Sequence, residues 1–178
     1  PDPATGKPDP EKMKAVLAAH PEIARFMAWS KSAPTPDSLA NTRFNGVNAF
    51  RLIDAQGKER IVRWSMRPHA PFAAADPAQL ERAGRDYLAR DLERRLADGP
   101  LRWDMVMQFA APGDPVEDPS QPWPDSRPES VVGTLTLVRA EPQAAGPCLD
   151  LNFDPLILPK GIAGTSDPVL HARSSVYS

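Results

Sequence analysis

Residues 44–66 have the sequence FNGVNAFRLIDAQGKERIVRWSM, and this stretch decides the fold class. Its first half, residues 44–53, is rich in residues that favour β-strands. Residues 54–57, Asp-Ala-Gln-Gly, supply the side chains of a tight turn. In the second half two sets of side chains alternate, Ile61, Arg63 and Ser65 on one face and Val62, Trp64 and Met66 on the other. The stretch therefore predicts a β-hairpin of two antiparallel strands.

Helical patterns precede and follow the hairpin. Asp9 and Pro10 are suited to begin a first helix, and apolar residues at helical spacing over 23–30 predict a second. Residues 76–98 predict a longer helix, because an apolar stripe runs through them. Residues 103–110 and 131–138 have the composition of two further strands. Helices combined with antiparallel strands indicate an α+β fold.

The composition limits the classes of function and marks the connections. The 178 residues carry a formal net charge of −2, which gives no general attraction to nucleic acid. Cys148 is the single cysteine, so an intramolecular disulfide is excluded. The 22 prolines gather at residues 1–10, 112–128 and 142–159. We expect residues 112–128 to form a long wrapping connection between two strands.

The tail of the chain carries the strongest chemical signal. Residues 171–178 read HARSSVYS, so a helix here places Arg173 and Tyr177 one turn apart on one face. A guanidinium beside a phenol favours the ionised phenolate. A phenolate is a hard anionic ligand suited to ferric iron, which makes Tyr177 a candidate metal ligand.

The tail and the residues before it resemble the proximal haem segment of the catalase family. The matching residues are Asn152-Phe153-Asp154-Pro155, Pro159-x-Gly161-Ile162 and Ser166-Asp167-Pro168, followed by Arg173 and Tyr177. The resemblance implies haem b as cofactor, with Tyr177 as the axial ligand of its iron and Arg173 as the charge partner of Tyr177. It also implies that Phe153 packs at the proximal face of the haem.

The resemblance extends over residues 20–178. Residues 26–29 and 41–50 are similar to the catalase segment that leads into the barrel, and residues 62–64 fit the second strand of its hairpin. Residues 85–88, 103–105, 111–115 and 122–124 are closer to the catalase-related peroxidases. The resemblance implies part of an antiparallel catalase-type β-barrel with flanking helices. We therefore expect residues 1–178 to form one partial catalase-like domain, with the N-terminal distal haem region and the C-terminal end outside it.

Two departures from the family pattern concern the haem surroundings. The large catalases place a His of the second hairpin strand between an Asp and the Arg that contacts the Tyr, and the matching residue here is Ser65. We expect Ser65 to accept a hydrogen bond from Arg173, with Asp167 as the anionic partner. None of His20, His69 and His171 fits the distal motif of the family. The catalytic His and Asn are therefore expected upstream of this chain, and none of its residues is assigned a catalytic role.

These features predict a haem-dependent oxidoreductase that reduces hydrogen peroxide or organic peroxides with a small organic electron donor. Two alternatives stay open, an allene-oxide-synthase-like rearrangement of hydroperoxides and a haem-binding fragment without activity. The isolated fragment is expected to be inactive. No nucleic-acid partner is expected, and a homo-oligomer stays open. The resemblance favours the periplasm, with the cytoplasm as the alternative.

Overall fold

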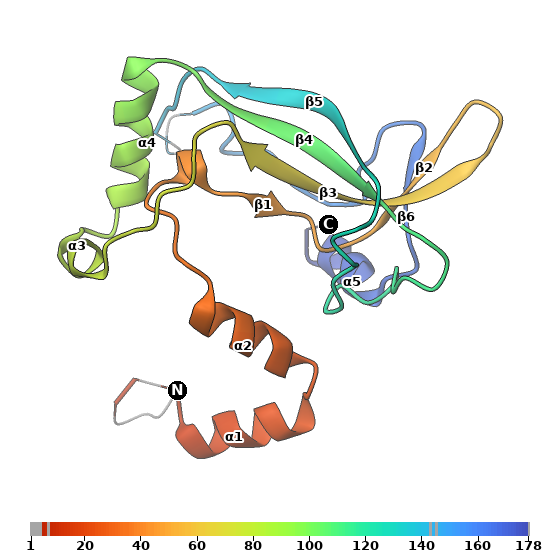
Figure 1. Cartoon of the computed structure of the whole chain (residues 1–178), viewed down its shortest axis with the longest axis horizontal. Helices are drawn as coiled ribbons and strands as arrows, with labels where there is room; N and C mark the ends of the chain where they lie inside the picture. Colours follow the sequence, from red (N-terminus) through yellow and green to blue (C-terminus); the bar gives the residue numbers. More distant parts are fainter. Residues whose placement is uncertain (1–4, 7, 143, 145, 178) are drawn as a thin grey trace. The chain divides into compact units, whose positions relative to one another are not determined.

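The computed structural model describes residues 5–6, 8–142, 144 and 146–177 (Figure 1). The chain divides after Pro34 into two compact units, and each is described by itself. The prediction that residues 1–178 form one partial domain stays a prediction. None of the helices formed by the described residues combines the length and apolar character needed to cross a membrane.

The first unit contains two helices, α1 (Pro10–Ala19) and α2 (Ile23–Ser32). The Asp9 carboxylate accepts hydrogen bonds from the amides of Glu11 and Lys12, so it caps α1 as its sequence position predicts. In α2 the rings of Phe26 and Trp29 lie 5.8 Å apart, as expected for residues three positions apart on a helix. Both predicted helices are confirmed.

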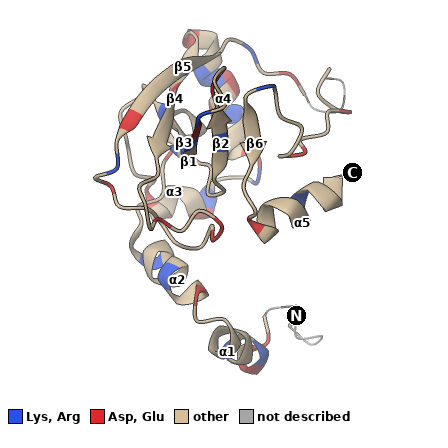
Figure 2. Cartoon of the chain, turned by 90° about the vertical axis from the view of Figure 1, so that its right-hand side faces the viewer, with Lys and Arg blue, Asp and Glu red and all other residues tan. Residues whose placement is uncertain are grey.

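The second unit is built on an antiparallel sheet. Its strands are β1 (Phe44–Asn45), β2 (Phe50–Ile53), β3 (Glu59–Pro68), β4 (Leu101–Phe109), β5 (Glu129–Leu137) and β6 (Ile162–Gly164). Their order is β5-β4-β3-β2-β6, with β1 pairing with the far end of β3 (Figures 1 and 2). Among the described residues the sheet is open, because β5 and β6 end the order on opposite sides. The α+β class is confirmed.

The predicted hairpin is present. Phe50 lies opposite Val62, and the Asp54 carboxylate accepts hydrogen bonds from the amides of Gln56 and Lys58, which fixes the turn. The first strand is interrupted, because β1 ends at Asn45 and β2 begins at Phe50. A Cβ at Gly46 would lie 2.4 Å from the Trp64 ring, so only glycine permits this close approach of the backbone to the ring.

The single helix predicted over residues 76–98 is wrong. Two helices occupy this range, α3 (Pro77–Arg82) and α4 (Tyr87–Asp98). Ala83 ends α3 with an extended ψ of 136°, and Gly84, which favours helix poorly, follows it. The break lets α4 lie against the short 3₁₀ helix η1 (Leu39–Asn41), where the Ser38 hydroxyl donates to Asp91.

The core of the second unit lies between the sheet and its connections. Val62 of β3 and Val106 of β4 are buried, and Trp103 of β4 donates from Nε1 to the Thr42 carbonyl. Trp123 is also buried, although it lies in the connection between β4 and β5. Residues 110–128 contain no helix or strand, so the predicted long connection is confirmed.

Candidate functional site

The predicted site residues of the tail lie on one helix, α5 (Pro168–Tyr177). The Asp167 carboxylate begins this helix by accepting hydrogen bonds from the amides of Val169 (2.8 Å) and Leu170 (3.4 Å). Leu170 is fully buried and anchors the first turn. Arg173 and Tyr177 are four residues apart on α5 and therefore share a face. The helical tail is confirmed.

Arg173 is joined to Asp167 through a third side chain, that of Asn48. The Arg173 Nη1 donates to Asn48 Oδ1 over 2.9 Å, and Asn48 Nδ2 donates to Asp167 Oδ2 over 2.7 Å. Asn48 is 3% exposed and Asp167 is fully buried. The amide satisfies both partners because it has an acceptor and a donor at its two ends. A buried acid and a cation are thus connected through a neutral group.

Ser65 does not occupy the place that the sequence predicts for it. Its hydroxyl lies 3.5 Å from Arg43 Nη2, whereas Arg173 donates to Asn48. The reason is topological. Phe50 of β2 pairs with Gly164 of β6, so the residues just before Phe50 run beside the residues that lead into α5. Ser65 lies further along the sheet, opposite Val106 of β4.

The segment around Phe153 contacts the last turns of α5. Ser174 Oγ donates to Asp154 over 2.9 Å, and Asn152 Nδ2 donates to the Tyr177 carbonyl over 2.5 Å. Phe153, between these two residues, is 68% exposed, and Tyr177 is 45% exposed. The structure therefore brings the predicted aromatic residues to one end of α5 and leaves both side chains partly open.

The three histidines are engaged elsewhere. His171 Nε2 donates to the Thr165 carbonyl over 3.0 Å, so the ring faces the segment between β6 and α5. His20 Nδ1 lies 3.0 Å from Glu22, and His69 Nε2 lies 2.8 Å from Asp104. Each histidine thus has a partner unrelated to the Tyr177 side chain.

A second guanidinium lies in the same electrostatic environment as Asp167. Arg63 of β3 is 8% exposed, and burial lowers its pKa below the usual value. The charges of Asp167, Asp118 and Asp114 oppose this effect, with Asp167 contributing most among them. Asp167 is therefore a buried anion under the influence of a buried cation other than Arg173.

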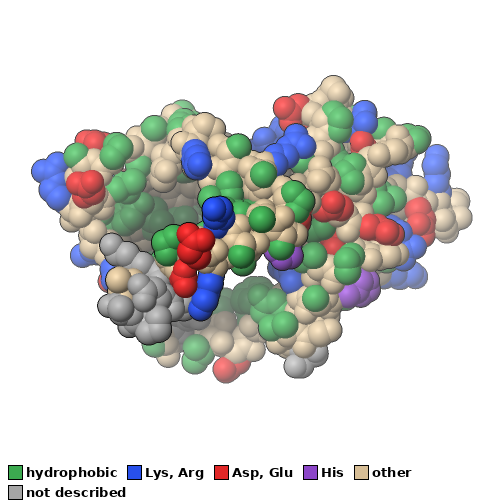
Figure 3. Space-filling model, turned by 90° about the horizontal axis from the view of Figure 1, so that it is seen from below, with side chains coloured by type: hydrophobic (Ala, Val, Ile, Leu, Met, Phe, Trp, Pro, Cys, Tyr) green, Lys and Arg blue, Asp and Glu red, His purple; other side chains and the backbone are tan. Residues whose placement is uncertain are grey.

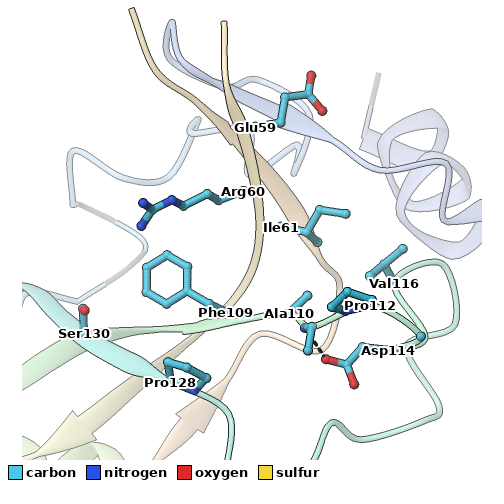
Figure 4. A pocket seen from close by; sticks show the side chains of 12 residues that line it. Glu59, Arg60, Ile61, Phe109, Ala110, Pro112, Asp114, Val116, Pro128 and Ser130 are labelled. Atoms are coloured by element: carbon cyan, nitrogen blue, oxygen red, sulfur yellow. Dashed lines mark hydrogen bonds between the residues drawn. The ribbon is translucent and has the colours of Figure 1, made fainter. Parts of the chain in front are cut away.

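A cavity lies apart from α5. It measures about 750 Å³ and opens where the connection after β4 meets β3 and β5 (Figure 4). The Arg60 guanidinium extends toward the Phe109 ring, with 5.8 Å to the ring centroid. Neither Arg173 nor Tyr177 lines this cavity. The molecular surface in Figure 3 shows apolar side chains mixed with charges of both signs.

The end of α5 presents a phenol among exposed apolar side chains. The phenol of Tyr177 is accessible there, and the exposed apolar side chains of Phe153 and Val176 accompany it. Arg173, one turn earlier on α5, is held by buried Asn48, which in turn donates to buried Asp167. Among the described residues, no group of three or more His, Cys, Asp or Glu side chains is placed to hold a metal ion. An accessible phenol oxygen beside exposed apolar side chains is compatible with the prosthetic group implied by the sequence.

Comparison with known proteins gives a consistent result. The sequence model of the family described as catalase matches residues 1–178. A catalase-related peroxidase of Synechococcus elongatus is 42% identical over the whole chain, and one of Mycolicibacterium paratuberculosis is 33% identical over 97% of it. The matched parts are 52% and 55% of those two proteins, so the chain spans about half the length of the curated relatives it matches.

Solved structures agree on the fold. A bacterial catalase superposes on 98% of this chain with a TM-score of 0.80 and 20% sequence identity, and the match covers 36% of that catalase. A fungal catalase matches 80% of this chain with a TM-score of 0.72 and 22% identity, over 30% of its own length. At this level of identity the similarity shows a shared fold, and the open sheet corresponds to part of it.

Proposed function

Since this chain belongs to the catalase family, we propose that it is the part of a peroxide-reducing oxidoreductase that binds haem b through Tyr177. The observation that carries this proposal is the connection from buried Asp167 through buried Asn48 to Arg173, which lies one helical turn before Tyr177. An arginine on a helix surface is ordinarily free to move. Here its guanidinium is fixed by a buried amide, as a residue that tunes a neighbouring ligand requires.

The reaction we propose consumes a peroxide and two electrons. Haem supplies redox-active iron for cleavage of the O–O bond, and a small organic donor supplies the two electrons. Two protons complete the balance, so that hydrogen peroxide yields two molecules of water and an organic hydroperoxide yields an alcohol and water. The catalytic His and Asn that handle these protons are proposed to lie outside this chain.

The residues of this chain prepare the ligand. Arg173 is proposed to be the charge partner of Tyr177 on the same face of α5. Asn48 orients the guanidinium and is itself oriented by Asp167, whose other oxygen caps α5. Because an amide does not titrate near neutral pH, the connection fixes a geometry and does not conduct a proton. Phe153 is proposed to pack against the face of the haem on the Tyr177 side.

A change of Tyr177 to Phe in the full-length protein tests the ligand. We expect the high-spin ferric haem absorption spectrum of the purified protein to disappear, because the phenol oxygen is lost and the ring is kept. The chain contains one other tyrosine, Tyr87 on α4, and Tyr87→Phe is the matched control that should leave the spectrum intact. An unchanged spectrum in Tyr177→Phe would sink the assignment.

The choice of reaction is tested separately. Oxidation of a chromogenic donor with hydrogen peroxide is expected for a peroxidase. Consumption of a lipid hydroperoxide without any donor would instead indicate the allene-oxide-synthase-like rearrangement. The periplasmic location is likewise a proposal that rests on the resemblance, and fractionation of cells that express the full-length protein tests it.

A further inference from the structure

Arg63 donates hydrogen bonds to three backbone carbonyls. Its Nη1 donates to the Gln121 carbonyl over 2.7 Å, and its Nη2 donates to the carbonyls of Pro115 and Asp118, both over 3.1 Å. The guanidinium also lies 4.6 Å from the centroid of the Trp123 ring, whose Nε1 donates to the same Pro115 carbonyl. Arg63 thus fixes residues 115–123, which we call the anchored loop.

The anchored loop is connected in turn to the segment that leads into α5. Thr165 Oγ1 lies 3.4 Å from the carbonyl of Val116 and 3.2 Å from that of Ala49, the neighbour of Asn48. The Thr165 carbonyl accepts the hydrogen bond from His171 Nε2 on α5. Thr165 is 7% exposed, so solvent does not readily replace these contacts. A continuous set of contacts therefore leads from Arg63 to the helix that carries Arg173 and Tyr177.

We propose that Arg63 is a positioning residue for α5, acting through the anchored loop and Thr165. The mechanical coupling stands on the contacts alone, whereas its effect on haem rests on the proposed function. The same cation also balances the buried charge of Asp167, which raises the pKa of Arg63 against the lowering by burial. Loss of Arg63 therefore affects α5 both through the loop and through Asp167.

The residue type suits this role. An arginine presents several N–H donors in a planar fork, so it can serve three carbonyls and still lie over an aromatic ring. A lysine has the charge but donates from a single point and does not form a planar stack. Arg63→Lys should therefore keep the positive charge near Asp167. It should not keep the anchored loop in place, because it loses the three hydrogen bonds to the loop carbonyls.

Hydrogen exchange of the full-length protein tests the coupling. In Arg63→Met, we expect the amides of the anchored loop (residues 115–123) and also those of α5 to exchange at least tenfold faster, because the loop no longer supports Thr165. The control is Arg60→Met, the same change at an exposed position three residues earlier on β3. Faster exchange in the loop with unchanged exchange in α5 would overturn the proposal.

Thr165→Val is a second variant, in case Arg63→Met does not fold. Valine has nearly the same shape as threonine but lacks the hydroxyl that contacts Val116 and Ala49. Alone, Thr165→Val should speed exchange in both α5 and the anchored loop, and unchanged exchange in either segment contradicts the coupling. Where both variants fold, the effect of Thr165→Val on α5 should be smaller in the Arg63→Met background than in the wild type. Strictly additive effects would show that Arg63 and Thr165 act on α5 independently.

A spectroscopic readout separates positioning from general stability. The absorption spectrum of the haem-loaded full-length protein should shift in Arg63→Met, whereas a core truncation such as Val106→Ala should lower the unfolding temperature without that shift. Equal spectra in the two variants at matched loss of stability would leave Arg63 as a structural residue only and reject the proposal. Tyr177→Phe tests the haem ligand itself, so failure of either idea is recognised separately.

Discussion

The side-chain amide of Asn48 holds the Arg173 guanidinium and connects it to Asp167. Asn48 accepts from a cation and donates to a carboxylate at the same time, which fixes its orientation, because a flipped amide would present the wrong atom to each partner. Since Asp167 is fully buried, water does not readily replace the Asn48 amide as the hydrogen-bond donor to Asp167 Oδ2. The position therefore tolerates few residues.

We expect Asn48→Ala to lower the free energy of unfolding by about 1–3 kcal/mol, since it leaves a buried acceptor and a charged donor without their partner. Urea unfolding of the full-length protein measures this. Asn45→Ala is the matched control, because Asn45 is exposed three residues earlier, and it should change stability by less than about 0.5 kcal/mol. Equal losses in the two variants would show that the Asn48 contacts carry little energy.

The residue scale also shows which contacts can be predicted from sequence. The pair Arg173 and Tyr177 follows from helical spacing, which is local. Asn48 meets Asp167 and Arg173 across 119 and 125 residues, and no periodicity carries that information. Strand alternation places Ser65 on a face of β3, but it does not tell which segment covers that face. For this reason the sequence predicts the helix that carries Arg173 but does not identify Asn48 as the residue between Arg173 and Asp167.

At the level of elements, the backbone before β6 depends on one glycine. Gly161 has a φ of 89°, and a Cβ there would lie 3.2 Å from the Ile53 carbonyl oxygen. Its own carbonyl accepts the Ile53 amide over 2.7 Å, which extends the pairing of β2 with β6. Because α5 follows β6 directly, this turn contributes to the placement of the helix.

Gly161→Ala should therefore destabilise the protein by about 1–3 kcal/mol, through backbone strain and crowding together. Gly113 has nearly the same unusual φ, 90°, but a Cβ added there would meet nothing within 4 Å, so Gly113→Ala carries the strain without the crowding. Urea unfolding should find Gly161→Ala the more damaging of the two. The reverse order would show that the close approach to Ile53 relaxes freely.

The connection after β4 contains an ion pair that predicts a pH dependence. Arg127 donates to both oxygens of Asp114 over 2.7 and 2.8 Å. The hydrogen bonds from Arg127, and then that from the Ala111 amide, hold the pKa of Asp114 below its usual range. A lowered pKa stabilises the folded state above the unfolded value of about 4, and this contribution is lost as the pH falls through the folded pKa.

Arg127→Met should therefore be less stable than the wild type at pH 7, and the difference should shrink as the pH falls below about 4. Urea unfolding between pH 3 and pH 7 measures the two curves. Arg102→Met, at an exposed position of β4, is the control and should show a difference that does not vary with pH. A deficit for Arg127→Met that persists unchanged in acid would mean that Asp114 is not the group responsible.

Elements differ in how well sequence predicts them. The hairpin was predictable because alternation and turn residues occur together over residues 44–66. Strand β6 has three residues, too few for any period to show, and its existence depends on pairing with β2. The break between α3 and α4 was missed because the apolar stripe continues across Gly84, although the backbone does not remain helical there.

For the whole molecule, the open sheet and the greater length of the relatives both indicate that this chain corresponds to part of the catalase fold. The described strands form an open sheet, and the chain spans about half the length of the curated relatives it matches. Buried Asp167 and Asn48 and the exposed Arg173 that Asn48 binds all lie within the chain. The ligand side of the proposed haem site is therefore present, while a group that moves protons on the opposite side has no candidate among the described residues.

We accordingly expect these 178 residues alone, even when loaded with haem, to reach less than a hundredth of the peroxidase turnover of the full-length protein. None of His20, His69 and His171 fits the distal motif of the family, and their hydrogen bonds go to Glu22, Asp104 and the Thr165 carbonyl. Turnover is measured per bound haem, with the absorption spectrum giving the occupancy and Tyr177→Phe giving the background.

Turnover within tenfold of the full-length protein would show that the acid-base group lies inside this chain. His69→Gln and His171→Gln would then identify it, because only loss of the responsible histidine should abolish that activity.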